Sequence, residues 1–397
     1  MKKILFITQL LPYPPYSGGK LKTFKILKIL AQKYHLQVIC FHDQKHHQKN
    51  AQKLSTLLNI KVKSFHWPVI SKANKKLIIK AVASLFSLKP FRVYKYFNPK
   101  LAKYITKLTS QHNFNIIYLD HNTSYQYLKY INKSTNSKVI YDEHNLDYLA
   151  MQRTAKHQIN PLKKIFFYYD SLKLYLYEKS MLKKLDLIFC ISQTDLINLK
   201  KLGAQPSQLK HLPVPFKPNN QFQFHRSKST ILFVGLMSWE PNIKAFWWFY
   251  KKIFPLIKQK LPSVKLIVIG PLPSKKLLCQ ATTDNSLQVT GQVPTLISYY
   301  KKANALVAPI LFGGGIRLKI LHALAHGIPT ISTTIGAEGI NPKSLLIANT
   351  KEDFAKKTIK ILTQPKLAKQ FSQAGLTTIK TNYSQVKTSR ALNLIES

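Results

Sequence analysis

Short runs of aliphatic and β-branched residues alternate with longer amphipathic stretches along the whole chain. In the first half these runs occur at residues 4–7, 37–41, 61–65, 116–119, 138–141 and 187–191. A second series occurs at residues 231–235, 265–269, 287–290, 305–307 and 328–332. Apolar runs separated by helical patterns predict buried strands of a mainly parallel sheet, with helices on both faces. The pattern therefore predicts an α/β protein with two sheets.

A break in this pattern predicts the boundary between two domains. Residues 212–218 are rich in proline, and the polar stretch 219–229 follows them. The chain has 397 residues, of which 45% are hydrophobic, and this is enough for two cores of ordinary size. We expect one domain over residues 1–215, a second over 216–383, and a last helix within 384–397.

Cysteine content and the N-terminus favour a cytoplasmic protein. Cys40, Cys190 and Cys279 are far apart and lie in apolar runs, which predicts neither disulfides nor a metal site of the Cys-x-x-Cys type. The first apolar run is interrupted at Thr8 and soon meets Pro12, so it is typical of a buried strand and not of a signal peptide. No apolar stretch approaches the roughly 18–20 residues of a spanning helix.

The charge of the chain admits two explanations. Lysine and arginine number 61 against 15 acidic residues, a formal net charge of +46, and lysine supplies nearly all of it. AT-rich coding would produce such a composition on solvated faces without any function. Alternatively, a few of these lysines on one face would suffice for attachment to an anionic membrane. The basic residues are dispersed and no nucleic-acid-binding motif is present, so we expect no specific nucleic acid partner.

The most informative segment is the glycine-rich stretch 312–329, which reads FGGGIRLKILHALAHGIP. A glycine turn allows a ligand to approach the backbone, and the helix that follows offers unpaired N–H groups and the positive end of its dipole. Arg317 and Lys319 add two cationic side chains. A planar guanidinium can bind a diphosphate through two parallel hydrogen bonds. The segment therefore predicts a phosphate site that includes Gly314, Gly315 and both cations.

This segment, continued by TISTTIGAEG at 330–339, closely resembles the donor-binding segment of glycosyltransferase family 4. The resemblance implies the GT-B fold, in which two Rossmann-like domains face each other across a central cleft and the last helix crosses back to the first domain. The family glutamate that binds the nucleotide ribose is replaced by His322, and the first glutamate of the commoner family signature is replaced by Gly314. An imidazole cannot act as a two-oxygen acceptor for two hydroxyl groups.

Further donor-binding residues follow from the same resemblance and from positions after strands, where open α/β sheets bind ligands. The resemblance places Gly18 and Gly19, Gly235 and Gly270 along the donor, and Glu338 at the donor sugar. Taken alone, each glycine is also compatible with a simple turn.

His144 matches a family histidine that lies beside the donor sugar. Taken alone, it is more often a structural residue at a strand end. Asp142 and Glu143 either hold its imidazole or contact the acceptor, and Asp147 can cap the following helix.

Together these residues predict a metal-independent, retaining hexosyltransferase. The donor would be a nucleotide-diphosphate sugar and the acceptor an envelope glycan or a lipid-linked molecule, with His144, Arg317 and Lys319 acting in catalysis. The chain contains no Asp-x-Asp motif and implies no cofactor or metal. The alternative prediction is a catalytically inactive GT-B protein that binds a glycan or a partner.

Segments 75–89 and 163–177 combine lysines with bulky apolar residues. They are either ordinary packed helices or interfacial helices that would hold the protein at the inner face of the cell membrane.

Overall fold

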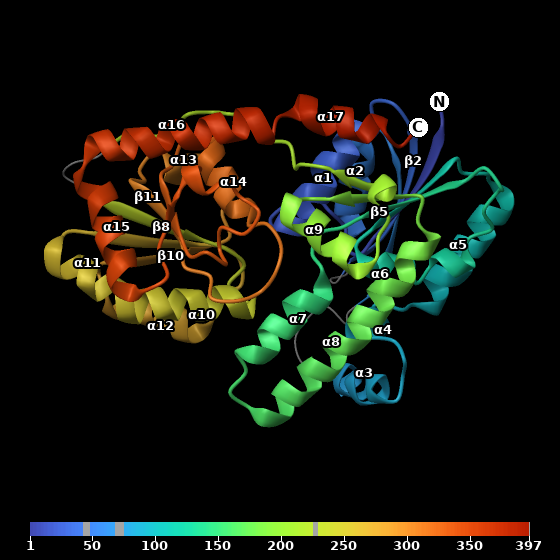
Figure 1. The fold of residues 1–397 in the computed structure, drawn as a ribbon, viewed down its shortest axis with the longest axis horizontal. Coiled ribbons are helices and arrows are strands. Elements are labelled where there is room, and N and C mark those ends of the chain that lie inside the picture. The colour runs from blue at the N-terminus through green and yellow to red at the C-terminus, as the bar shows by residue number, and fades with distance from the viewer. Residues whose placement is uncertain (43–47, 68–74, 225–228, 397) are drawn as a thin grey trace. The chain divides into compact units, whose positions relative to one another are not determined.

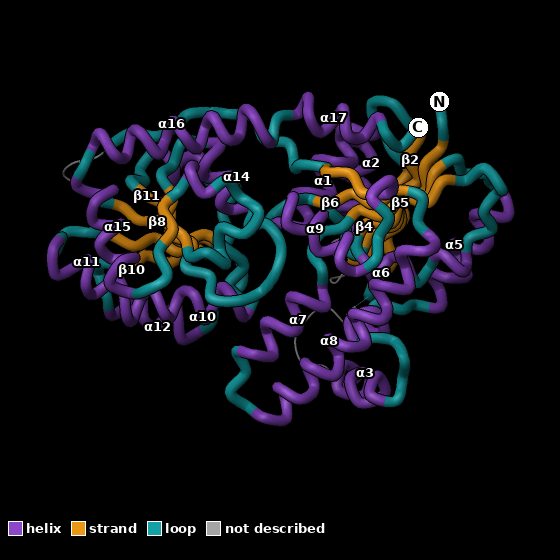
Figure 2. The backbone as a smooth tube through the Cα atoms, viewed as in Figure 1, coloured by secondary structure: helices purple, strands orange, loops and turns teal. Residues whose placement is uncertain are grey.

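The computed structural model describes residues 1–42, 48–67, 75–224 and 229–396. The chain divides into two compact units. The first unit contains Met1–Val214 together with Thr388–Ser397, and the second contains Pro215–Lys387. Part of the expected linker, residues 225–228, lies outside the described residues. Each unit is built around one parallel sheet (Figures 1 and 2).

The sheet of the first unit has seven strands in the order β3-β2-β1-β4-β5-β6-β7, and all neighbouring strands are parallel. The strands are β1 (Lys3–Thr8), β2 (His35–His42), β3 (Lys61–His66), β4 (Ile116–Asp120), β5 (Lys138–Asp142), β6 (Leu187–Cys190) and β7 (Leu209–His211). The predicted strands of this half are confirmed. The edge strand β7 was not predicted, because its sequence Leu-Lys-His carries no apolar run.

Helices cover both faces of this sheet, and several start at the residues that favour helix N-termini. Asn98 accepts backbone hydrogen bonds at the start of α5, and Asn160 does so at the start of α8; in both helices proline takes the first position. The helices are α1 (Gly18–Leu30), α2 (Gln48–Leu58), α3 (Lys75–Leu85), α4 (Phe91–Lys95), α5 (Pro99–Gln111), α6 (Asn122–Tyr125), α7 (Asp147–Lys156), α8 (Pro161–Met181) and α9 (Gln193–Leu202). α7 and α8 pack against each other as a helical hairpin (Figure 1).

The sheet of the second unit has six parallel strands in the order β10-β9-β8-β11-β12-β13. They are β8 (Thr230–Val234), β9 (Lys265–Ile269), β10 (Leu287–Gly291), β11 (Ala305–Ala308), β12 (Thr330–Ser332) and β13 (Leu346–Ile347). The helices are α10 (Glu240–Trp248), α11 (Phe254–Lys260), α12 (Lys275–Thr283), α13 (Ile297–Tyr300), α14 (Leu318–Ala325), α15 (Lys351–Thr363) and α16 (Pro365–Asn382). A π-helical turn, Phe249–Ile253, joins α10 to α11. The two-residue strand β13 was not predicted.

The last helix, α17 (Gln385–Asn393), carries the chain into the first unit. Leu392 and Ile395 are buried in the core of that unit, together with residues of β1, β2 and α1. Thr388 Oγ1 donates a hydrogen bond of 2.8 Å to the carbonyl of Pro213. The C-terminal segment is therefore an integral part of the first unit. Within the described residues, no helix is long and apolar enough to span a bilayer.

Candidate donor-binding site

The turn before α14 has a backbone conformation that favours glycine at two positions. Gly313 and Gly315 have φ angles of +110° and +76°, both in the region that favours glycine. Arg317 follows with φ −88° and ψ 90°, so it is extended, and α14 begins at Leu318. The helix thus begins after Arg317, which leaves Arg317 in the turn. This position allows Arg317 and Lys319 to serve one ligand although they are two residues apart.

The guanidinium of Arg317 is held inside the turn. Nη1 donates a hydrogen bond to the carbonyl of Gly314, and the guanidinium carbon lies 5.5 Å from the ring centroid of Trp239. Only 6% of the residue is exposed. The side chain of one of the few arginines in the chain is therefore fixed in place before any ligand binds.

Lys319 lies beside the loop that follows β8. Its Nζ donates a hydrogen bond of 2.7 Å to Oδ1 of Asn242, at the start of α10. Burial, and then the nearby charge of Arg317, lower the pKa of Lys319 to about 7. An anionic ligand would reverse this effect, because it favours the charged form of the amine. The pair is thus suited to an anion that arrives with its own negative charge.

Gly235 and Gly270 bring two strand-end loops into contact. A Cβ atom on Gly235 would lie 2.6 Å from Nδ2 of Asn242 and 3.1 Å from Nζ of Lys319. Gly270 has a φ of +153°, and a Cβ atom there would lie 1.8 Å from the carbonyl oxygen of Gly235. Position 270 therefore requires glycine, and a larger residue at position 235 would displace the side chain of Asn242. The structure brings together Gly235, Gly270, Gly314, Arg317 and Lys319 at the carboxyl ends of β8 and β9 and the N-terminus of α14, where phosphate groups bind in such folds.

His322 lies one turn further along α14, in a group of aromatic rings. Its Nδ1 is 2.8 Å from the hydroxyl of Tyr300, and its ring also neighbours Phe216 and His326. The imidazole is therefore anchored from the side of α13. Glu338 occupies a different loop, after β12, where it is half-buried. The donor-binding roles expected for both residues stay predictions.

In the first unit, His144 is held by a carboxylate that the sequence analysis did not single out. Asp120, the last residue of β4, accepts a hydrogen bond of 2.6 Å through Oδ1 from Nε2 of His144. Its other oxygen lies 3.1 Å from Nδ1 of His121. The two imidazole rings stack with centroids 3.7 Å apart. Asp120 was visible in the sequence as a rare acidic residue at a strand end, directly before a histidine.

Of the two roles expected for Asp142 and Glu143, holding the imidazole is wrong, and contact with the acceptor stays a prediction. Asp142 forms a buried ion pair of 2.6 Å with Lys22 and accepts a hydrogen bond from Tyr118. Glu143 accepts from the hydroxyl of Tyr141 and from the backbone of Asn145.

Asp147 pairs with Arg92 at 2.6 Å instead of capping α7 with its side chain. In this strongly basic chain, two of these carboxylates therefore pair with Lys22 and Arg92, and Glu143 holds the loop around His144.

Of the glycines after β1, Gly19 contacts this cluster. It lies in the first turn of α1, and a Cβ atom there would lie 3.5 Å from Nε2 of His121 and 3.8 Å from Nδ1 of His144. Gly18 is exposed at the start of the same helix. In the part of the chain that the structure describes, Asp120, His121 and His144 are also the group with ligand atoms close enough to share a metal ion, within 4.8 Å of one another.

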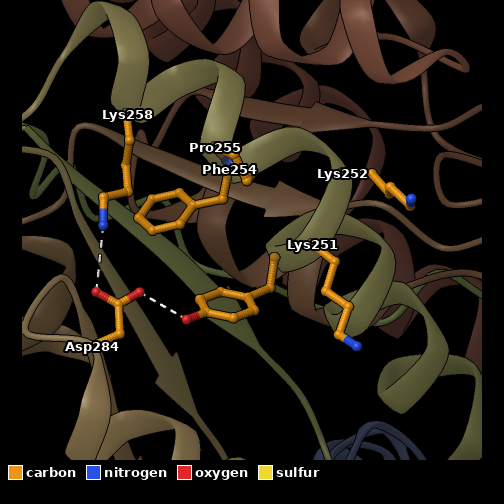
Figure 3. Close-up of a pocket in the computed structure, with 7 residues that line it drawn as sticks. Lys251, Lys252, Phe254, Pro255, Lys258 and Asp284 are labelled. Carbon is orange, nitrogen blue, oxygen red and sulfur yellow. Dashed lines mark hydrogen bonds and ion pairs between the residues drawn. The ribbon is translucent and has the colours of Figure 1, made fainter.

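A surface hollow of about 600 Å³ lies on the second unit beside the π-helical turn (Figure 3). Asp284 there accepts a hydrogen bond of 2.7 Å from Tyr250 and pairs with Lys258 at 3.4 Å. Burial would raise the pKa of Asp284, but hydrogen bonds from Ser286 and Tyr250 lower it to about 2. A carboxylate satisfied in this way shapes the surface and offers no acid or base, so we assign the hollow no chemistry.

Comparisons with known proteins agree with this geometry. Residues 228–364 match the family described as glycosyl transferases group 1. These residues are therefore similar to group 1 glycosyltransferases, and the chain has a GT-B fold. This match contains β8 to β13 and the whole glycine turn, so the cluster around Arg317 lies inside the matched residues.

Solved structures of similar fold cover nearly the whole chain. HepE of Anabaena, in complex with UDP and glucose, is 12% identical with a TM-score of 0.67, and covers 100% of this chain and 99% of its own. A mutant of S. aureus TarM, in a complex that includes UDP, is 13% identical with a TM-score of 0.71 and covers 100% of both chains. WaaG, a glycosyltransferase involved in lipopolysaccharide biosynthesis, is 14% identical with a TM-score of 0.66 and covers 99% of both. The predicted GT-B fold is confirmed.

A curated relative gives a genetic context. An uncharacterized 44.6 kDa protein in the cps region of Klebsiella pneumoniae is 27% identical over 237 residues. The match takes in 57% of this chain and spans 60% of the length of that relative.

Proposed function

We propose that this protein is a group 1 glycosyltransferase that transfers a sugar from a nucleotide-diphosphate sugar, with retention of configuration, to an envelope glycan or a lipid-linked acceptor. The observation that carries the proposal is the prearranged pair of cations, Arg317 and Lys319, at a glycine turn and a helix N-terminus. The context of the Klebsiella pneumoniae relative supports a role in polysaccharide synthesis.

The chemistry of the proposed reaction follows from charge. Breaking the bond between the sugar and the diphosphate leaves negative charge on the phosphate oxygens, and fixed cations and helix N–H groups stabilise it. Arg317 is already oriented by Gly314 and Trp239, so little reorganisation is needed during the reaction. We infer that retention arises because the departing phosphate assists the acceptor hydroxyl on the same face. The proposed reaction needs no metal ion.

A donor screen tests this proposal. The purified protein is incubated with UDP-, GDP- and ADP-sugars, and thermal stabilisation is measured for each. Stabilisation by one donor class, followed by release of the nucleoside diphosphate in the presence of a glycan acceptor, is the expected result. UDP-sugars come first, because HepE and TarM have been solved with UDP. Absence of stabilisation by all three classes would contradict the proposal.

One observation favours the inactive alternative. At the position of the family glutamate, His322 is anchored to Tyr300 and surrounded by aromatic rings. A site rebuilt in this way could bind a nucleotide without transferring its sugar. Stabilisation by a donor without any turnover would support that alternative.

We expect His322→Glu to keep or strengthen nucleotide binding. A carboxylate can accept hydrogen bonds from both ribose hydroxyls, which an imidazole cannot do, and it can still accept from the hydroxyl of Tyr300. The measurement is calorimetric titration with UDP, and His322→Gln serves as a neutral control. Weaker binding by a folded Glu variant would show that the site has been rebuilt around imidazole.

An exposed apolar stripe on α8 supports the proposed attachment to a membrane. Leu162, Ile165, Tyr169, Leu172 and Leu176 are all exposed and follow one another at intervals of three and four residues. This spacing places them on one face of the helix. A stripe of this kind on a surface marks an interaction site.

Charge on and near α8 indicates an anionic bilayer as the occupant. Lys163, Lys164 and Lys179 are exposed, whereas both carboxylates of the helix, Asp170 and Glu178, are buried. Within the other predicted segment, 75–89, the described side chains add five exposed apolar residues: Ile79, Val82, Leu85, Phe86 and Leu88. The side chains of residues 75–78 lie outside the described residues.

We expect the protein to bind vesicles that contain anionic lipid, to bind neutral vesicles weakly, and to be released as salt screens the attraction. Replacing Leu162, Ile165 and Leu172 together by serine should reduce vesicle binding at least tenfold in a sedimentation assay. The matched control replaces Leu57 and Ile197 by serine, because both are equally exposed but lie on α2 and α9. Equal binding to neutral and anionic vesicles, or equal loss in both variants, would contradict this prediction.

A further inference from the structure

The carboxylate of Asp120 lies at the centre of the histidine cluster in the first unit. Four side chains donate to it: His144 at 2.6 Å and His121 at 3.1 Å, and the hydroxyls of Thr8 and Thr23 at 2.5 and 2.8 Å. The residue is completely buried. Burial alone would raise the pKa of Asp120, but the two imidazoles and their hydrogen bonds bring it well below its usual value. The carboxylate is therefore ionised and accepts all four hydrogen bonds.

An ionised carboxylate can only accept hydrogen bonds, so its partners must donate. Nε2 of His144 and Nδ1 of His121 therefore each carry a proton. Burial lowers the pKa of His144 well below 6.5, which keeps its imidazole neutral. The shared carboxylate thus fixes one tautomer of each ring.

In each ring, the nitrogen that does not contact Asp120 lies close to Gly19. Nδ1 of His144 and Nε2 of His121 both lie within 4 Å of the position that a Cβ atom on Gly19 would occupy. His121 also lines a small cavity of about 60 Å³ together with Ser17, Gly19 and Lys20. With Nδ1 donating to Asp120, the neutral form of His121 turns an acceptor nitrogen, Nε2, toward this cavity.

The backbone of His121 carries strain that its position explains. Its φ of 72° and ψ of 149° are rarely adopted by residues other than glycine, and such conformations cost about 1–3 kcal/mol. This conformation sets the imidazole between Asp120 and the cavity, stacked on His144. Strain of this kind is concentrated at ligand-binding sites.

We propose that Asp120 is a positioning residue: it holds His121 and His144 as a pair, so that His121 accepts a hydrogen bond from a sugar hydroxyl in the cavity beside Gly19. The ligand class is a neutral, hydroxyl-bearing part of a sugar, since the acceptor nitrogen suits an O–H donor. The identity of that sugar rests on the proposed function, whereas the fixed tautomers do not.

Imidazole ¹⁵N spectra of the full-length protein test the tautomers. The His121 and His144 signals are assigned by their loss in His121→Phe and His144→Gln. Asp120→Asn should shift both signals, because the amide no longer imposes N–H donation from both rings. Asp186→Asn is the matched control: Asp186 accepts a hydrogen bond from the backbone of Val139, remote from the histidines in sequence and contacts. Unchanged signals in Asp120→Asn would overturn the positioning role.

Kinetics with the donor identified by the screen test the ligand. Loss of a residue that orients another functional group costs about 10–100-fold, so kcat/KM should fall by this factor in Asp120→Asn and stay unchanged in Asp186→Asn. His121→Phe keeps the stacked ring but removes the acceptor, and it should raise KM for a sugar substrate more than it lowers kcat. Should Asp120→Asn fail to fold, Thr8→Val removes one hydroxyl donor and should give the same changes to a smaller extent.

Two results would overturn the inference even in an active enzyme. One is an unchanged KM for donor and acceptor in His121→Phe. The other is a shift of both histidine signals on adding micromolar zinc, reversed by EDTA, since a bound metal ion would replace the protons on the carboxylate side. If the wild-type protein transfers no sugar, the proposed function fails, and the ¹⁵N spectra still decide the role of Asp120.

Discussion

Replacing Arg317 by alanine should lower the rate of sugar transfer by roughly a hundredfold or more, the scale of losing one preorganised charge-stabilising group. The guanidinium of Arg317 is buried and oriented in the turn before α14. It can therefore stabilise the negative charge that develops on the diphosphate in the transition state without first changing its own position. The alanine variant removes the positive charge that would stabilise the departing diphosphate. The measurement is kcat with a saturating donor, and circular dichroism checks that the fold survives.

Two further variants sharpen this test. Arg317→Lys keeps a positive charge but loses the planar fork, and we expect an intermediate rate. Arg390→Ala removes an exposed arginine of α17 and should leave the rate unchanged. A folded Arg317→Ala variant with normal turnover and normal nucleotide affinity would exclude Arg317 from the site.

Replacing Gly270 by alanine should destabilise the second unit by about 3 kcal/mol or more and abolish nucleotide binding. The new Cβ atom would lie 1.8 Å from the carbonyl oxygen of Gly235, and the backbone φ of +153° disfavours any side chain. Steric overlap and backbone strain each cost about 1–3 kcal/mol. The loop after β8 must therefore move, and it carries Gly235 beside Lys319. Thermal melting and calorimetry with a nucleotide measure both effects.

Gly291→Ala separates overlap from strain. Gly291 has a φ of +69°, and a Cβ atom there would meet nothing within 4 Å. Its replacement should cost only the strain of a left-handed residue, about 1–2 kcal/mol. Equal losses of stability in the two variants would show that the contact between Gly270 and Gly235 is not decisive.

The fold could be predicted from local pattern because its strands are buried on both faces. The run at residues 4–7 became β1, and the run at 265–269 became β9, since continuous apolar sequence is the signature of a central parallel strand. The strands that escaped prediction, β7 and β13, are edge strands of three and two residues. Such short edges have only one neighbour and need no apolar run.

The part of the candidate site that lies within one continuous segment could be predicted from the sequence. The glycine turn, Arg317 and Lys319 lie within seven consecutive residues, and their placement follows from the turn and the first turn of α14. The partner of His144 was not predictable in this way. Asp120 is 24 residues away and meets it because β4 and β5 are neighbouring parallel strands, with Asp120 in register with Asp142. Sequence alone offered Asp142 and Glu143 as nearer candidates, but these neutralise Lys22 and hold Tyr141 instead.

The C-terminal segment has a consequence for biosynthesis. Asn393 accepts a hydrogen bond of 2.8 Å from Lys33, and Glu396 accepts one of 2.9 Å from Tyr34, both in the turn between α1 and β2. The first unit therefore acquires these contacts, and the buried Leu392 and Ile395, only after the entire second unit has left the ribosome. Domains usually fold in order during synthesis, the N-terminal one first. In this chain the N-terminal unit is completed last, because residues from Thr388 onward can join it only after the whole second unit has been synthesised.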